Sequence, residues 1–136
     1  MTFHRAAFGQ AAVPLLLCLL LPETPARPAA AQDASVLEAL PHEILWERRE
    51  GRTTLVLRWL SPRLDATPPV PFETVEATAD RLCRTVALPL ARMTGGGEEA
   101  IVTLLARPLA RGRRDPSVRR HIFAYDISEG RCTWLP

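Results

Sequence analysis

The N-terminal quarter of the chain constrains its fold most, because it has the features of an export signal and leaves room for only one domain. A short positive start at Arg5 precedes an apolar run from Ala11 to Leu21, and small residues follow up to Ala31. This order is typical of a secretory signal peptide, and the run is shorter than the roughly 20 residues that span a bilayer. We therefore expect residues 1–31 to be a signal peptide that is cleaved near Ala31.

Cleavage at this point leaves 105 residues, with fifteen arginines and fourteen acidic residues. This length suits one domain, and a near-neutral charge gives little long-range attraction to polyanions. We expect a flexible lead-in over 32–41, a single domain over 42–136 and no nucleic-acid partner. No second apolar segment is long enough to hold the mature chain in a membrane, so the expected location is the periplasm or the medium.

Alternation of apolar and polar residues predicts a β-hairpin over residues 43–60. Leu55, Leu57 and Trp59 share one face of its second strand, and a glycine-containing turn at 50–52 separates the two strands. This hairpin is the first part of the predicted domain.

Apolar residues at three- and four-residue spacing then predict one amphipathic helix, which begins at Phe72 and continues to Val86. Acidic residues in its first turns and arginines nearer its end suit the helix dipole. Pro89 ends this helix or lies just beyond its end.

Three strands are expected after the helix. The continuous apolar run 100–106 predicts a central strand, residues 121–128 alternate again, and 131–135 form a short last strand. The expected fold is an α+β domain of order β-β-α-β-β-β, with one helix packed on a mostly antiparallel sheet. The aromatic residues expected to fill the core or cover one sheet face are Trp46, Trp59, Phe123, Tyr125 and Trp134.

The mature chain keeps two cysteines, Cys83 and Cys132. An even pair in an exported protein favours a disulfide, and closing a loop of about fifty residues stabilises a domain by roughly 4 kcal/mol. Two alternatives stay open, both of which would make a small thiol or metal enzyme. One is a cysteine nucleophile, although a helix C-terminus does not lower a thiol pKa. The other is a zinc site that recruits His42 and His121, although no two of these ligands have the usual close spacing.

The strongest functional signal is the arginine segment, residues 107–120, which holds six arginines and one aspartate. It suits a phosphate, a lipopolysaccharide head group or an acidic partner. The alternative is a solvated loop whose arginine content follows the base composition of the genome. All seventeen residues counted as Lys or Arg are arginine, and the chain contains neither lysine nor asparagine, as is typical of GC-rich genomes. The candidate anion-binding residues are Arg107, Arg111, Arg113, Arg114, Arg119 and Arg120.

Residues 82–89 (LCRTVALP) and the ending Cys132-Thr133-Trp134, together with 102–108, resemble a small exported alphaproteobacterial family of unknown function. The resemblance covers roughly residues 42–134. It implies the α+β fold and the pairing of Cys83 with Cys132, and it brings no catalytic residues. Some relatives carry the label acetolactate synthase, but such an enzyme is several times longer and holds thiamine diphosphate.

The sequence therefore predicts a disulfide-stabilised, non-enzymatic binding or interaction module, whose partner is a protein or an envelope component. No Gly-flanked serine elbow is visible, and we expect no catalytic residues, no cofactor and no metal. The alternative is an anion-binding accessory module that works through the arginine segment. The oligomeric state stays open, because hairpin edges pair readily between chains.

Overall fold

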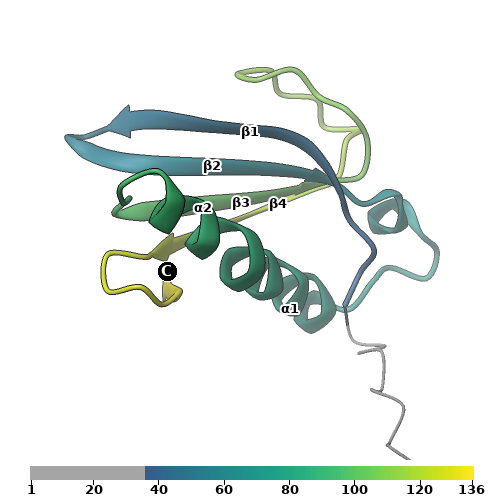
Figure 1. Cartoon of the computed structure of the whole chain (residues 1–136). Coiled ribbons are helices and arrows are strands. Elements are labelled where there is room, and N and C mark those ends of the chain that lie inside the picture. The colour runs from purple at the N-terminus through teal and green to yellow at the C-terminus, as the bar shows by residue number, and fades with distance from the viewer. Residues whose placement is uncertain (1–35) are drawn as a thin grey trace, which may run out of the picture. The chain divides into compact units, whose positions relative to one another are not determined.

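The computed structural model describes residues 36–136, which form a five-stranded sheet with helices on one side (Figure 1). The predicted signal peptide, residues 1–31, lies outside the described residues. The strands, in their spatial order, are β1 (Leu40–Arg49), β2 (Arg52–Leu60), β3 (Glu99–Leu105), β4 (Arg120–Asp126) and β5 (Thr133–Leu135). The helical elements are η1 (Pro62–Asp65), α1 (Phe72–Leu82), η2 (Cys83–Ala87) and α2 (Leu88–Met93).

The predicted α+β class and the mostly antiparallel sheet are confirmed. Strands β1 and β2 form the expected hairpin, closed by a two-residue turn in which Glu50 and Gly51 have φ values of 50° and 82°. Two successive positive φ angles characterise the type I′ turn, whose twist matches that of the flanking strands. One detail differs from a plain meander, because β2 and β3 are parallel.

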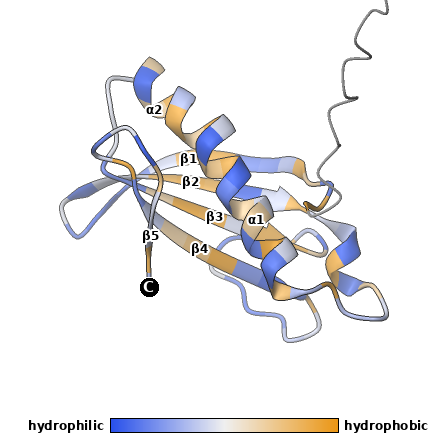
Figure 2. Ribbon diagram, turned by 90° about the horizontal axis from the view of Figure 1, so that it is seen from below, coloured by the Kyte–Doolittle hydropathy of each residue, from blue (hydrophilic) through white to orange (hydrophobic). Residues whose placement is uncertain are grey.

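The parallel pair explains where the helices lie. For β3 to run parallel to β2, the chain must first return to the end of the sheet at which β2 begins. The helical elements α1, η2 and α2 make this return across one face of the sheet. Figure 2 shows the helices lying over apolar strands. Leu57, Val102 and Phe123 come from three adjacent strands and pack there against Val75 and Ala79 of α1, all of them buried.

The predicted end of the helix at Pro89 is wrong, because the helix continues through this residue to Met93. Proline lacks an N–H and its ring clashes with the carbonyl of the residue four positions earlier. The π-helical turn η2 absorbs this conflict, since the N–H of Leu88 bonds to the carbonyl of Cys83, five residues back. The helical segment is therefore longer than the sequence pattern indicated.

Two other expectations differ from the structure. Leu37 lies in the predicted lead-in yet is buried, and its N–H donates to Thr78 Oγ1 at 2.8 Å, so the packed part of the chain begins before residue 42. Of the aromatic residues expected to fill the core or cover one sheet face, Trp46 and Trp134 lie outside the core, because they are exposed. Trp46 still serves a structural role, because its ring leaves no room for a Cβ at Gly97.

Candidate binding groove

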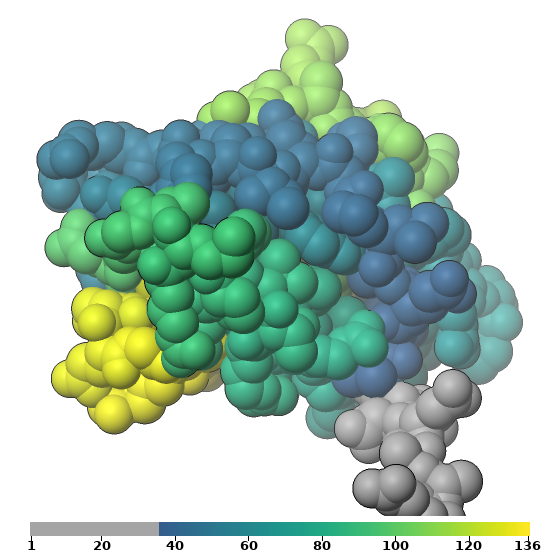
Figure 3. Space-filling view, in the orientation of Figure 1, coloured from purple at the N-terminus to yellow at the C-terminus, as the bar shows by residue number. Residues whose placement is uncertain are grey.

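The sheet face opposite the helices carries the main candidate site. Val56, Ile101 and Thr103 lie side by side on β2 and β3 and are mostly buried, although no helix covers them. Ile122 continues this row onto β4 and is 58% exposed. The cover over this face is the arginine segment, which projects beyond β1 at the top of Figure 3. A β-sheet face that is partly apolar and partly covered is a suitable floor for a ligand.

Arg58 binds the tip of the arginine segment, residues 109–113, to the sheet. Its side chain is buried on β2, donates to Glu43 Oε2 at 2.6 Å and also donates to the carbonyl oxygen of Leu109. Arg111 makes a second link by pairing with Glu47 of β1. A buried arginine needs such partners, because a charge removed from water without them is very costly.

Polar contacts also fix the base of the segment. Arg107 pairs with Asp65 of η1 at 3.3 Å and donates to the carbonyl oxygen of Ser117 at 2.6 Å. Arg119 donates to the carbonyl oxygen of Leu64 at 2.8 Å. Hydrogen bonds from Ser117 hold the pKa of Asp115 below its usual value. The segment is thus anchored at both ends and at its tip.

Between the tip of the segment and the sheet runs a groove of about 340 Å³, called the arginine groove below. Its floor is Val56, Ile101, Thr103, Leu105 and Ile122. The charged residues that line it are Arg49, Arg58, Arg111, Arg113, Arg120 and the single acid Glu47. An apolar floor with guanidinium groups around it can hold a carboxylate or phosphate that carries an apolar part, because arginine binds such anions in a bidentate manner.

The structure separates the six predicted anion-binding arginines into two sets. Arg107, Arg111 and Arg119 are engaged in the internal contacts described above. Arg113, Arg114 and Arg120 make no ion pair with any residue between 36 and 136, and of these Arg113 and Arg120 line the groove while Arg114 does not.

Arg49 and Arg58 are groove residues that the sequence did not single out. Arg58 alternates with Leu57 and Trp59, so the sequence pattern placed its side chain on the face of β2 opposite to theirs. The pattern gave no sign, apart from the position on a strand, that this side chain is buried and not solvated. Arg49 sits one residue before the hairpin turn, within 3.8 Å of Glu47. Nothing in the local sequence shows that the arginine segment returns to cover these residues.

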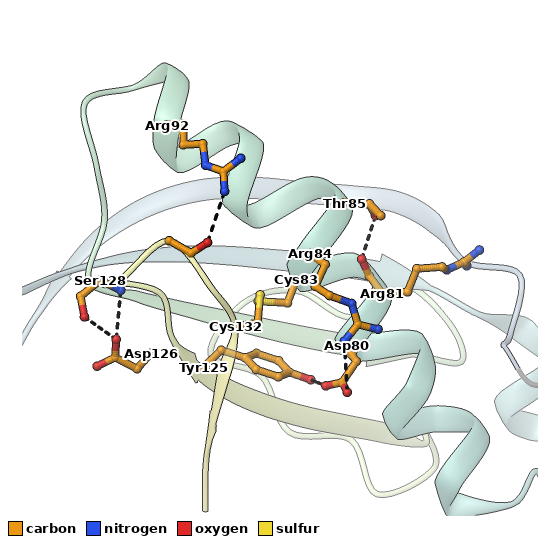
Figure 4. Close-up of a disulfide and its surroundings, with 11 residues drawn as sticks. Asp80, Arg81, Cys83, Arg84, Thr85, Arg92, Tyr125, Asp126, Ser128 and Cys132 are labelled. Carbon is orange, nitrogen blue, oxygen red and sulfur yellow. Dashed lines mark hydrogen bonds and ion pairs between the residues drawn. A yellow bond between two sulfur atoms is a disulfide. The ribbon is translucent and has the colours of Figure 1, made fainter.

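On the helix-covered side, Cys83 and Cys132 form the predicted disulfide, with their Cα atoms 6.2 Å apart (Figure 4). Because both sulfur atoms are in this bond, neither cysteine is a free thiol that could act as a nucleophile or bind zinc. Close by, Tyr125 donates its hydroxyl to Asp80 Oδ1 at 2.8 Å. Burial, and then Asp80, raise the pKa of Tyr125 above its usual value.

The two histidines of the zinc hypothesis lie in different places. His42 lies beside Arg58 and the tip of the arginine segment. His121 lies at the start of β4 on the helix-covered face, where its ring contacts that of Phe72. Within residues 36–136, no group of three or more His, Cys, Asp or Glu side chains is arranged to hold a metal ion. Over the same part of the chain, no helix is both long and apolar enough to cross a membrane.

Fold and site together define a small disulfide-linked α+β domain with an arginine-lined groove on its sheet. The chain belongs to the family of unknown function DUF6497, whose model matches residues 20–136. No curated protein and no solved structure matches the chain.

Proposed function

We propose that this protein is an exported, non-enzymatic binding module of the periplasm, and that it takes its ligand in the arginine groove. The sequence of residues 1–31 supports export, as does the Cys83–Cys132 bond, because disulfides persist in oxidising compartments. The groove carries the binding part of the proposal. It joins a mostly apolar and mostly buried floor to a charged rim, and such a combination of apolar lining with a few placed polar groups is typical of ligand sites.

A second, narrower candidate is that the ligand is an anion. The observation that favours it is the presence in the groove of Arg113 and Arg120, neither of which pairs with an acid in the described part of the chain. Guanidinium groups stay charged at every physiological pH and match the geometry of phosphate and carboxylate. A phosphorylated envelope component or an acidic protein segment has this chemistry.

Mass spectrometry of protein exported by its own signal tests the location and the bond. The expected species is a chain near 32–136 that is two hydrogens light and takes no alkyl group until it is reduced. A retained N-terminal segment would overturn export, and free thiols would overturn the disulfide.

Titration with pyrophosphate tests the anion candidate at low and at raised salt. The Arg113→Ala/Arg120→Ala variant should bind at least tenfold more weakly, and binding to the wild type should weaken with salt because exposed charges are screened. Arg114→Ala is the matched control, since this residue belongs to the same segment but does not line the groove. Equal losses in the control, or none in the double variant, would reject a groove-specific anion site.

A substrate screen tests the non-enzymatic part. Turnover that a single substitution abolishes would show that the domain is an enzyme. A screen without turnover, combined with groove-dependent binding, supports the proposal.

A further inference from the structure

A second surface, at the opposite end of the sheet from β1, has the features of a peptide site. Strand β4 pairs with β3 along its whole length, from Arg120 to Asp126. On its other side, β5 pairs only with the stretch from Ala124 to Asp126. Among the described strands, none lies opposite the outer edge of residues 120–123, which we call the open edge.

The hydrogen-bond pattern shows which backbone groups point outward there. The N–H of Ala106 donates to the carbonyl of Arg119, and the N–H of Ile127 donates to the carbonyl of Glu98. Opposite residues of an antiparallel pair exchange bonds at every second position. The odd-numbered residues of β4 therefore bond to β3. The N–H and C=O of Arg120 and Ile122 point away from β3, toward the open edge.

Exposed apolar side chains flank this edge. Phe72 and Trp134 are each 54% exposed, and with His121 and Phe123 they line a depression of about 300 Å³ on the helix-covered side. The ring centroids of Phe72 and Phe123 lie 6.0 Å apart. On the other side of the sheet, Ile122 is exposed and forms part of the floor of the arginine groove. Free backbone groups beside apolar pockets are the elements of strand addition.

The other edge of the sheet differs. Strand β1 contains Pro41, an irregular register between Pro41 and Glu43, and several charged side chains. Natural proteins use these devices to prevent a further strand from pairing. The open edge has neither a proline nor a bulge.

The charge of the open edge selects the occupant. Arg119 and Arg120 precede His121, and no acidic side chain lines the depression. Side chains of an added strand alternate between the two faces of the sheet. Those opposite His121 and Phe123 meet the aromatic depression, and the one opposite Arg120 meets a cation without an ion-pair partner.

We propose that the open edge of β4 binds an extended segment of a partner protein, in which apolar residues alternate with acidic ones. The segment continues the sheet beyond the end of β5, and the backbone groups of Arg120 and Ile122 bond to it. This site adjoins the arginine groove and shares Arg120 and Ile122 with it, but the aromatic depression and Arg113 each belong to one of the two sites only.

The probe is a short capped peptide of alternating valine and glutamate, titrated into isotope-labelled protein and followed by NMR. Chemical-shift changes should gather at residues 120–123, Phe72 and Trp134. N-methylation of the peptide should weaken binding at least tenfold at every second position and little at the positions between. A peptide with lysine in place of glutamate should bind at least tenfold more weakly.

Substitutions in the protein test the same edge. Ile122→Pro removes an outward N–H without removing a bond to β3, so it should abolish binding. Phe72→Ala should weaken binding, whereas Ile44→Ala, an exposed apolar residue of β1, is the matched control and should not. If the proline variant does not fold, the N-methylation series on the wild type decides the question alone.

Two results would overturn the proposal. One is a set of shift changes at the tip of the arginine segment that disappear in Arg113→Ala, which would mean that the glutamates only bind the groove. The other is self-association of the free protein through the open edge, detected by sedimentation, which would make a second copy the occupant. Arg113→Ala should leave peptide binding unchanged, so failure of the groove and failure of the edge are distinguishable.

Discussion

The two faces of the sheet are covered in different ways. The helix-covered face packs Leu57, Val102 and Phe123 against regular helices, and the Cys83–Cys132 bond ties those helices to the end of the chain. The groove face is covered by a segment without regular structure. Polar contacts help to hold its tip, chiefly the hydrogen bond from Arg58 to the carbonyl of Leu109 and the ion pair of Arg111 with Glu47.

This difference separates stability from recognition. Each large apolar side chain buried under the helices contributes about 1.5–3 kcal/mol. An exposed ion pair contributes only about 0–1 kcal/mol. The helices therefore contribute more to the stability of the fold than the arginine segment does. A ligand in the groove meets the polar contacts of this segment and not the helix-covered core.

The largest effect should come from the disulfide on the helix-covered face. Cys83→Ala/Cys132→Ala should lower the free energy of unfolding by roughly 4 kcal/mol, because the unfolded chain is no longer constrained by a loop with a sequence separation of 49. Urea unfolding with and without reductant measures this loss. Reductant should have no effect on the variant, and a wild-type loss below about 1 kcal/mol would contradict the prediction.

Truncation of one apolar residue on each face compares the covers directly. Leu57→Ala removes a fully buried side chain and should cost about 3 kcal/mol. Ile122→Ala removes a side chain that is 58% exposed and should cost less than about 1 kcal/mol. Urea unfolding of both variants gives the two values. Similar losses would mean that the arginine segment covers its face as firmly as the helices do.

The helix-covered face was largely predictable from the sequence, because local patterns specify it. The alternation of Leu55, Leu57 and Trp59, the helical spacing from Phe72 and the apolar run of β3 each identify an element and its buried side. The passage of the helix through Pro89 was not predictable in this way. It depends on the π turn at 83–87, which forms where packing on the sheet outweighs the local preference of proline.

The groove was predictable only in part. The arginine segment stood out by composition, but which of its arginines are engaged depends on contacts with residues far away in the sequence. Arg111 meets Glu47, and Arg107 meets Asp65. Such long-range pairs leave no local periodicity, so neither the groove nor the role of Arg58 could be read from spacing.

Arg58→Met tests how the tip of the arginine segment is held. The change keeps an apolar stem on β2 but removes the hydrogen bonds to Glu43 and Leu109, so it should cost about 1–2 kcal/mol. The more specific expectation is faster cleavage of the arginine segment by trypsin, because its tip is released. Arg63→Met is the control, as this residue lies on the exposed side of η1. Unchanged cleavage in Arg58→Met would show that other contacts hold the tip.

The smallest expected effect is a pH dependence that belongs to the helix-covered face. Burial, and then the charge of Arg119, lower the pKa of His121 below 6.5. The folded state therefore takes up the proton less readily than the unfolded state, so stability falls as the pH falls below about 6.5. An NMR titration of the His121 imidazole should give a pKa below 6.5, and His121→Gln should show a shallower loss of stability between pH 7 and 5. Because His121 contacts Phe72 where the helix cover ends, a pKa above 6.5 would mean that this end of the face is more open to water than the packing of Phe72 indicates.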